Sequence, residues 1–241
     1  MQENSELFNL FWENSKLTSS NIRQFKERID EYSGQDHQQK SLLYPGSDIP
    51  LPSAGDNLSK IMNQRKSVRE FSGREISHQK LGRLFSSLGL GKSGHRTFAS
   101  AGSTYALEVF AVLTQAEGNL SHKIVYYNSD NHSLTVLGQV ESYDSFKSLL
   151  NIETESTTPA AIFIFTIHAE RTIEKYGERG GRFALIEVGH AAQNLALRLA
   201  KEGLVGVELG GLMDDKVAEL LGIDKYPLKI VLGYACGFPK K

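Results

Sequence analysis

The spacing of apolar residues divides the chain into helix-like and strand-like segments. In residues 5–32 the apolar side chains recur at helical spacing, which predicts amphipathic helix. These side chains are Leu7, Phe8, Leu10, Phe11, Ile22, Phe25 and Ile29. Residues 33–57 are polar and rich in Gly, Pro and Ser, which predicts a connecting arm. We therefore expect an N-terminal helical segment with its arm (1–57) and a main domain (58–241).

The main domain is expected to be α+β. Apolar periodicity, together with an N-cap at Ser77, predicts helices at 58–62, 78–88, 146–150, 182–202 and 214–221. Runs of β-branched and aromatic residues predict strands at 108–114, 123–128, 133–137, 160–168, 206–209 and 228–235. The second and third strands are expected to form a hairpin, and the fourth to be buried on both faces. Because strands and helices alternate irregularly, one sheet with helices around it is favoured.

Charge and cysteine content exclude several classes of protein. The net charge is -1, from 27 basic and 28 acidic residues, so there is no bulk basic surface for nucleic acid. No apolar run approaches the ~18 residues of a membrane span, and the N-terminus does not resemble a secretory signal. A cytoplasmic location is therefore expected. The single cysteine, Cys236, excludes an internal disulfide framework, and no metal site is predicted.

Two segments carry side chains suited to ligand binding. Arg65, Ser67 and Arg69 alternate, so an extended backbone would present all three on one side. Two guanidiniums and a hydroxyl suit a phosphate and polar ring edges, although a solvated basic turn explains the spacing equally well. Residues 95–105 are small and hydroxylated, and such loops let backbone N–H groups approach a ligand. An ordinary loop is the commoner explanation.

Other patterns are weaker by themselves. Glycines at 89, 91 and 94 match G-x-G-x-x-G, but a helix precedes them, which favours a helix end and loop over a dinucleotide site. In the 182–202 helix, Glu187, His190, Ala191 and Asn194 share a face, where buried polar groups need partners. Two glycines at 210 and 211 follow a strand and expose backbone N–H groups there.

Taken together, four motifs resemble the nitroreductase superfamily of flavin enzymes. They are RKSVREF (65–71), SAGSTYALEVF (100–110), KYGERGGRFALIEVGHAAQN (175–194) and GVELGG (206–211). Within the superfamily the chain is most similar to the dehydrogenases that oxidise azolines in thiazole/oxazole-modified peptide pathways of the streptolysin S and microcin type. The resemblance implies an α+β fold with a central antiparallel or mixed sheet flanked by helices. It also implies an obligate homodimer with flavin mononucleotide (FMN) at its interface.

The resemblance also implies roles for individual residues. FMN-binding positions are Arg65, Ser67, Arg69, Ser100, Ala101, Gly102, Gln193, Asn194, Gly210 and Gly211. A C-terminal base, Lys240 or Lys241, is a further candidate for the phosphate. A Lys-Tyr pair before a Gly/Arg-rich turn is typical of azoline dehydrogenases, which makes Lys175 the expected base and Tyr176 a group that orients the ring or relays the proton.

Three departures from the family pattern concern the substrate. Alanines at 99 and 106 replace two usual prolines, which is expected to loosen the loop, and Gly181 replaces a usual aromatic ring of the pocket wall. The expected function is azoline oxidation on a peptide, with a cyclodehydratase complex as a further expected partner. Two alternatives stay open: an NAD(P)H-dependent nitro or quinone reductase, and a non-catalytic scaffold subunit of a heterocyclase complex.

Overall fold

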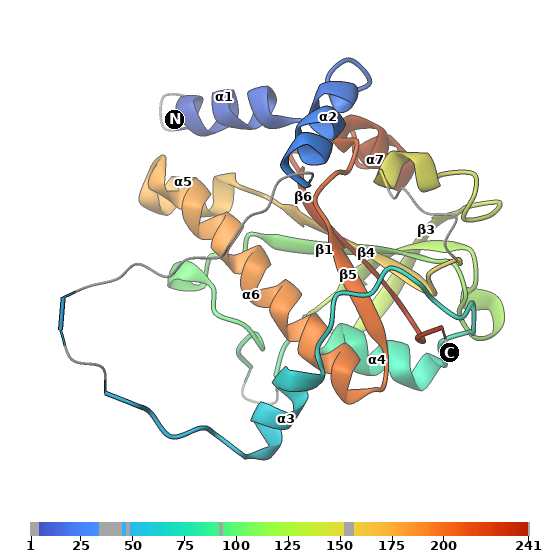
Figure 1. Cartoon of the computed structure of the whole chain (residues 1–241). Coiled ribbons are helices and arrows are strands. Elements are labelled where there is room, and N and C mark those ends of the chain that lie inside the picture. Colours follow the sequence, from blue (N-terminus) through green and yellow to red (C-terminus); the bar gives the residue numbers. More distant parts are fainter. Residues whose placement is uncertain (1–4, 34–44, 47–48, 92–93, 152–156, 241) are drawn as a thin grey trace.

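One six-stranded sheet forms the centre of the structure, a computed structural model that describes residues 5–33, 45–46, 49–91, 94–151 and 157–240 (Figure 1). The strands are β1 (Leu107–Leu113), β2 (Lys123–Asn128), β3 (Ser133–Gln139), β4 (Ala161–Ile167), β5 (Val205–Leu209) and β6 (Lys229–Gly237). Their order is β3-β2-β1-β4-β6-β5, and each neighbouring pair is antiparallel. The predicted β2–β3 hairpin is confirmed, and so is the complete burial of β4.

Seven α-helices surround the sheet in the described part of the chain. They are α1 (Glu6–Ser15), α2 (Ile22–Ser33), α3 (Asn57–Gln64), α4 (His78–Ser86), α5 (Glu170–Tyr176), α6 (Arg179–Lys201) and α7 (Asp214–Leu221). Short 3₁₀ turns occur at Ala101–Ser103, Gly118–Leu120 and Lys147–Leu150. The Ser77 hydroxyl accepts a hydrogen bond from Lys80 N at 3.3 Å, which confirms the predicted N-cap of α4. Among these helices none is long and apolar enough to cross a membrane.

Each face of the sheet has its own apolar core. The α6 face buries alternate β4 side chains such as Phe163 and Phe165 together with residues of α4 and α6. The opposite face buries Ile162 and Ile164 with residues of α7 and the Lys147–Leu150 turn. The division follows from the strand period of two, because successive side chains point to opposite faces. In Figure 1, α6 runs diagonally across the sheet and so spans it from β1 to β5.

The N-terminal amphipathic segment is broken into two helices. The break at 16–21 is held by Asn21, whose side chain accepts from Thr18 N and donates to Lys16 O, both at 2.8 Å. Phe8 and Trp12 of α1 are buried in the α6-side core, whereas α2 has no buried residue. Most of the predicted arm lies outside the described residues, so the boundary at residue 57 stays a prediction.

Helix α5 is the main element that the sequence pattern did not predict. Only Thr172 and Ile173 are buried in its seven residues, so it lacks an apolar stripe. Gly177, with φ of 59°, ends the helix. Lys175 and Tyr176 therefore lie in the last turn of a helix and not in an irregular dipeptide.

Candidate functional site

The segment that follows α3 is extended, as its alternating pattern predicts. Ser67 forms a parallel bridge with Gly206 of β5, and Val68 N donates to Gly206 O at 3.0 Å. Val68 is half-buried, whereas Arg65, Ser67 and Arg69 are exposed. Alternation along this short strand therefore presents both guanidiniums and the hydroxyl to solvent.

Positive charge gathers at this segment. Within the described residues, the guanidinium groups of Arg65 and Arg69 have no hydrogen-bond or ion-pair partner. The C-terminal segment runs antiparallel beside it, and Lys240 Nζ lies 3.5 Å from Glu70 Oε2. The other C-terminal candidate, Lys241, lies outside the described residues. Guanidiniums that are not paired within the chain, next to a hydroxyl, suit a phosphate group.

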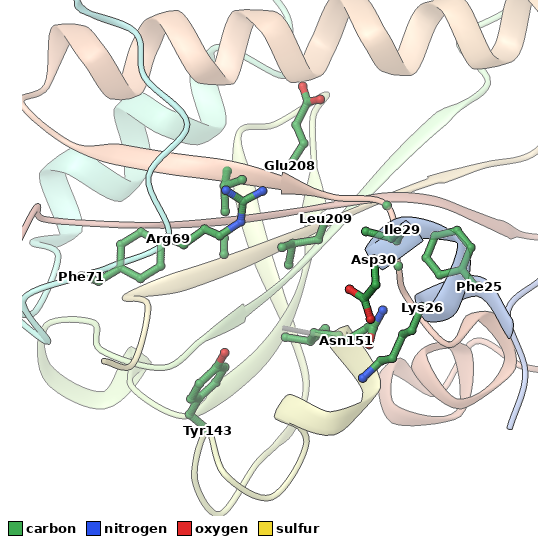
Figure 2. Close-up of a pocket in the computed structure, with 15 residues that line it drawn as sticks. Phe25, Lys26, Ile29, Asp30, Arg69, Phe71, Tyr143, Asn151, Glu208 and Leu209 are labelled. Atoms are coloured by element: carbon green, nitrogen blue, oxygen red, sulfur yellow. The ribbon is translucent and has the colours of Figure 1, made fainter. Parts of the chain in front are cut away.

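The paired glycines lie at the open end of β5. A Cβ atom built on Gly210 would meet no atom within 4 Å, whereas one on Gly211 would lie 2.8 Å from Asn151 Nδ2. Both glycines and Arg69 line a cavity of about 500 Å³ (Figure 2). In Figure 2 Glu208 points away from this cavity, as expected for a strand residue that precedes the inward-facing Leu209. The first group of candidate residues is therefore Arg65, Ser67, Arg69, Gly210 and Gly211.

Aromatic side chains give this cavity an apolar wall. Phe25, Phe71 and Tyr143 line it from α2, the extended segment and the loop before the Lys147–Leu150 turn. Burial raises the pKa of Tyr143 to about 12, so its phenol stays protonated at neutral pH.

A second group of candidates is held by the buried carboxylate of Glu187 on α6. Its Oε2 accepts from Ser100 Oγ at 2.6 Å, and its Oε1 accepts from Leu107 N at 3.0 Å. Glu187 is 1% exposed. The Ser100 hydroxyl accepts in turn from Tyr105 N at 2.9 Å. The expectation that polar groups on this helix face have partners is therefore confirmed for Glu187.

Side chains on the same face of α6 also contact the 95–105 loop at its N-terminal part. His190 Nδ1 lies 3.2 Å from Ala99 O, and Asn194 Nδ2 donates to Thr97 O at 2.8 Å. Gln193 is exposed. The predicted Gln193–Asn194 pair is thus divided, because the Asn194 amide donates to its own chain while Gln193 faces solvent.

Helix α5 holds the other side of the loop. Lys175 Nζ donates to Gly102 O at 3.0 Å, and Arg171 Nη1 donates to Tyr105 O at 2.8 Å. These two cations are four residues apart and so share a helix face. The loop that lacks two usual prolines is therefore held by side-chain hydrogen bonds from both α5 and α6.

Gly102 brings the two predicted catalytic residues together. Its φ is 56°, and a Cβ there would overlap the Tyr176 hydroxyl and the Lys175 ammonium. The Tyr176 ring packs edge-on against Phe183, with centroids 5.1 Å apart. Lys175 is exposed in the single chain. Lys175, Tyr176, Ser100, Ala101 and Gly102 thus form the second group.

The single chain keeps the two groups apart. In the sheet register Leu209 of β5 pairs with Gly233, which pairs with Ile164, which pairs with Phe110 of β1. Three strand spacings of ~4.8 Å, or about 14 Å, therefore separate the end of β5 from the strand that follows the second group. One ligand reaches both groups only if it bridges this distance or if another chain contributes.

Two contacts of the turn after α5 were not apparent from the sequence pattern. A Cβ at Gly181 would overlap the ring of Phe8, so the ring of this α1 residue fills the space beside Gly181 and leaves no room for a side chain at 181. The carboxylate of Glu178 accepts from the first N–H groups of α1. Position 8 is too distant in sequence for a local pattern to have predicted these contacts.

Other reactive groups have structural roles. Cys236 is fully buried, and burial raises the pKa of its thiol to about 12, in agreement with its predicted role as a packing residue. No cluster of three or more potential metal ligands occurs among the described residues.

Comparisons with known proteins agree with this geometry. Residues 62–238 match the model of the nitroreductase family. The chain is 31% identical over 192 residues to MJ1384 of Methanocaldococcus jannaschii, a protein named as a nitroreductase. The match covers 76% of this chain and 94% of MJ1384. It is 28% identical over 139 residues to the microcin B17-processing protein McbC of Escherichia coli, covering 55% of this chain and 50% of McbC.

Solved structures show the same fold. A chain of the E. coli microcin synthetase McbBCD complex with truncated pro-MccB17 bound gives a TM-score of 0.70 at 18% identity, covering 93% of this chain and 95% of that chain. The NADPH:FMN oxidoreductase from Vibrio harveyi gives a TM-score of 0.53 at 17% identity, covering 77% and 70%. These matches confirm the expected α+β fold.

Proposed function

Because the chain belongs to the nitroreductase family, we propose that it is an FMN-dependent dehydrogenase that oxidises azoline rings of a peptide to azoles. The observation that carries the proposal is the convergence of Lys175 and Tyr176 on Gly102. The similarity to McbC, and to a chain of a microcin synthetase complex, supports a peptide substrate and a cyclodehydratase complex as partner.

The residues of the first group fit FMN. Arg65 and Ser67 would hold the phosphate, Arg69 a polar edge of the ring, and the open backbone at Gly210 the redox edge, with Gly211 beside it. When bound, FMN supplies the redox chemistry by accepting a hydride. The isoalloxazine ring of FMN also needs protein contacts on its other side, a second wall of the site, which the second group of residues would provide.

We propose that this second wall comes from another copy of the chain. β1, the strand that follows Ser100, Ala101 and Gly102, lies three strand spacings from β5 in one chain, and a homodimer would join the two groups. On α6, Ile186 is 52% exposed, and a Cβ at Gly189 would meet nothing within 4 Å. An exposed apolar residue beside a glycine suits close helix packing in such a dimer, with Gln193 on the same exposed face.

Lys175 would act as the base. Converting an azoline to an azole removes a proton from one ring carbon and a hydride from its neighbour. A lysine accepts a proton only in its neutral form, so the ammonium must first lose a proton. The phenol of Tyr176, beside it over Gly102, would orient the ring or relay the proton.

The proposal is tested with the purified protein and an azoline-bearing peptide. We expect a yellow protein with the visible absorption of an oxidised flavin, and a product peptide that has lost two hydrogens per ring by mass spectrometry. A flavin-containing protein that leaves azolines unchanged would contradict the proposed reaction.

Two other functions have specific support. MJ1384 is named as a nitroreductase, which supports a nitro or quinone reductase as the alternative function. Rapid bleaching of the flavin by NAD(P)H under anaerobic conditions would favour that function. Similarity to a chain of a synthetase complex also supports the other alternative, a non-catalytic scaffold subunit of a heterocyclase complex. A protein that contains no flavin and takes up none on addition would favour that function.

Arg65→Ala and Arg69→Ala are each expected to weaken FMN binding by about 10–100-fold, because each removes one charge-assisted hydrogen bond of ~1.5–3 kcal/mol. Affinity is measured by titrating flavin-stripped protein and following the quenching of flavin fluorescence. Lys66→Ala is the matched control, since this exposed cation lies between them but alternates to the other side. A loss as large for Lys66→Ala would mean that only net charge matters.

A further inference from the structure

The loop segment that carries the second group has an unusual backbone. Gly102, Ser103 and Tyr105 have φ values of 56°, 56° and 47°. Residues other than glycine rarely adopt this left-handed conformation, and they keep it only where the surrounding contacts hold them there. Two of the three residues are not glycine, so residues 102–105 depend on contacts from the elements around them.

Helix α5 contacts both ends of this segment. Arg171 Nη1 donates to Tyr105 O at 2.8 Å, and Lys175 Nζ donates to Gly102 O at 3.0 Å. If Lys175 is the base, it takes up and releases a proton in each turnover, and its hydrogen bond to Gly102 O is weaker while the amine is neutral. Arg171 keeps its charge throughout, because guanidinium groups do not lose their proton in proteins. The contact from Arg171 is therefore the one that does not change during the reaction.

The Arg171 guanidinium is itself held by the sheet. The same Nη1 atom lies 2.6 Å from Glu108 Oε1 on β1, and Glu108 Oε2 accepts from Tyr126 Oη on β2 at 2.7 Å. The Glu108 side chain is 17% exposed, so salt screens this ion pair less than one at the surface. Burial, together with the hydrogen bond to Glu108, raises the pKa of the Tyr126 phenol, which therefore remains a donor at neutral pH. One guanidinium nitrogen thus joins two neighbouring strands to the loop.

A cation at position 171 is unfavourable for helix α5 by itself. Arg171 lies in the first turn of the helix, where the helix dipole disfavours positive charge. It also precedes Lys175 by four residues, a spacing at which like charges repel. The position of Arg171 is therefore explained by its contacts with Glu108 and Tyr105 and not by the helix.

We propose that Arg171 is a positioning residue, which is fixed by Glu108 and Tyr126 and holds residues 102–105 in place while Lys175 exchanges its proton. This inference rests on the proposed function, in which Gly102 and Lys175 belong to the active site. A displacement of reacting groups by about 1 Å costs up to about 100-fold in rate. A loop that has lost Arg171 should therefore slow the chemical step more than it weakens substrate binding.

The test combines hydrogen–deuterium exchange of the full-length protein with single-turnover reduction of its bound flavin by an azoline peptide. Arg171→Met keeps a long side chain of similar helix propensity but removes the charge and the donors. We expect faster exchange at the amides of Ser103, Thr104 and Tyr105, which are hydrogen-bonded within the loop. Flavin reduction should slow by about 10–100-fold, while the peptide concentration that gives half-maximal rate changes by less than about threefold. Arg171→Lys restores a cation with three donors and should recover most of both losses.

Two further variants separate positioning from a general loss of stability. Glu174→Gln removes a charge from an exposed residue of the same helix and should change neither measurement. The double variant Arg171→Met/Glu108→Gln removes the carboxylate that Arg171→Met leaves without its cation. It should stay as slow as Arg171→Met, because the loop still lacks its support. Recovery in the double variant would assign the loss to an unpaired carboxylate and would overturn the inference.

The same measurements distinguish this inference from the proposed function. An active wild-type protein whose Arg171→Met variant keeps its rate would overturn the inference alone, whether or not the loop exchanges faster. A slower Arg171→Met variant with unchanged exchange of the loop would also overturn it, because the loop would not have moved. A wild-type protein that leaves azolines unchanged would contradict the proposed function and, with it, this role of Arg171.

Discussion

Lys175→Ala is expected to lower kcat for azoline oxidation by about 10²–10⁴-fold, the usual contribution of general-base catalysis, while flavin content stays unchanged. Lys175 Nζ donates to Gly102 O at 3.0 Å and lies 5.6 Å from the centre of the Tyr176 ring, so it is in direct contact with the loop that contains the second group. The measurement is single-turnover reduction of the bound flavin by an azoline peptide.

Lys175→Arg separates catalysis from loop support. The hydrogen bond to Gly102 O shows that the lysine also holds the loop, so an alanine variant alone does not assign its role. An arginine restores a donor but stays protonated at neutral pH, because guanidinium pKa values exceed about 12. If Lys175 is the base, the arginine variant stays as slow as the alanine variant. Recovery of activity in Lys175→Arg would instead assign the lysine a structural role.

Glu187→Ala is expected to lower the free energy of unfolding by about 2–4 kcal/mol, because it leaves one buried and one half-buried donor without their acceptor. The donors are Leu107 N at the start of β1 and the Ser100 hydroxyl. The same variant is expected to lose flavin affinity, since Ser100 is itself one of the expected FMN-binding residues. Urea unfolding followed by circular dichroism measures the stability, and flavin titration measures the affinity.

Two further variants test this interpretation of Glu187. Glu187→Gln keeps a carbonyl acceptor for Leu107 N and should lose less than half as much stability. Gln193→Ala, at an exposed position on the same helix, should change stability by no more than about 0.5 kcal/mol. A loss as large in Gln193→Ala would show that the effect is not specific to the buried carboxylate, because alanine itself favours the helix.

Local pattern predicted most of the fold because the sheet is built from strongly apolar or β-branched runs. The strand predicted at 160–168 is β4 at Ala161–Ile167, and the helix predicted at 182–202 is α6 at Arg179–Lys201. The prediction was incomplete where a segment buries little. Helix α5 buries only two residues, and the segment at 5–32 breaks at 16–21 because Asn21 bonds to the local backbone there.

The candidate site was predicted in part. The alternation of Arg65, Ser67 and Arg69 was readable because an extended backbone is a local property. The partners of other candidate residues could not be predicted in this way. The amide of Asn194 donates to Thr97 O, a contact between residues 97 positions apart in the chain, and its place beside a flavin stays a prediction.

The sequence by itself determined the strands, the long helix and the family motifs, since apolar periodicity and residue spacing act over a few turns or strand lengths. Only the tertiary structure decided that Lys175 contacts Gly102, that Phe8 fills the space above Gly181, and that the two groups lie three strands apart. The first contact joins residues 73 positions apart and the second joins residues 173 positions apart, so their geometry follows from how the helices pack on the sheet and on each other rather than from any local pattern.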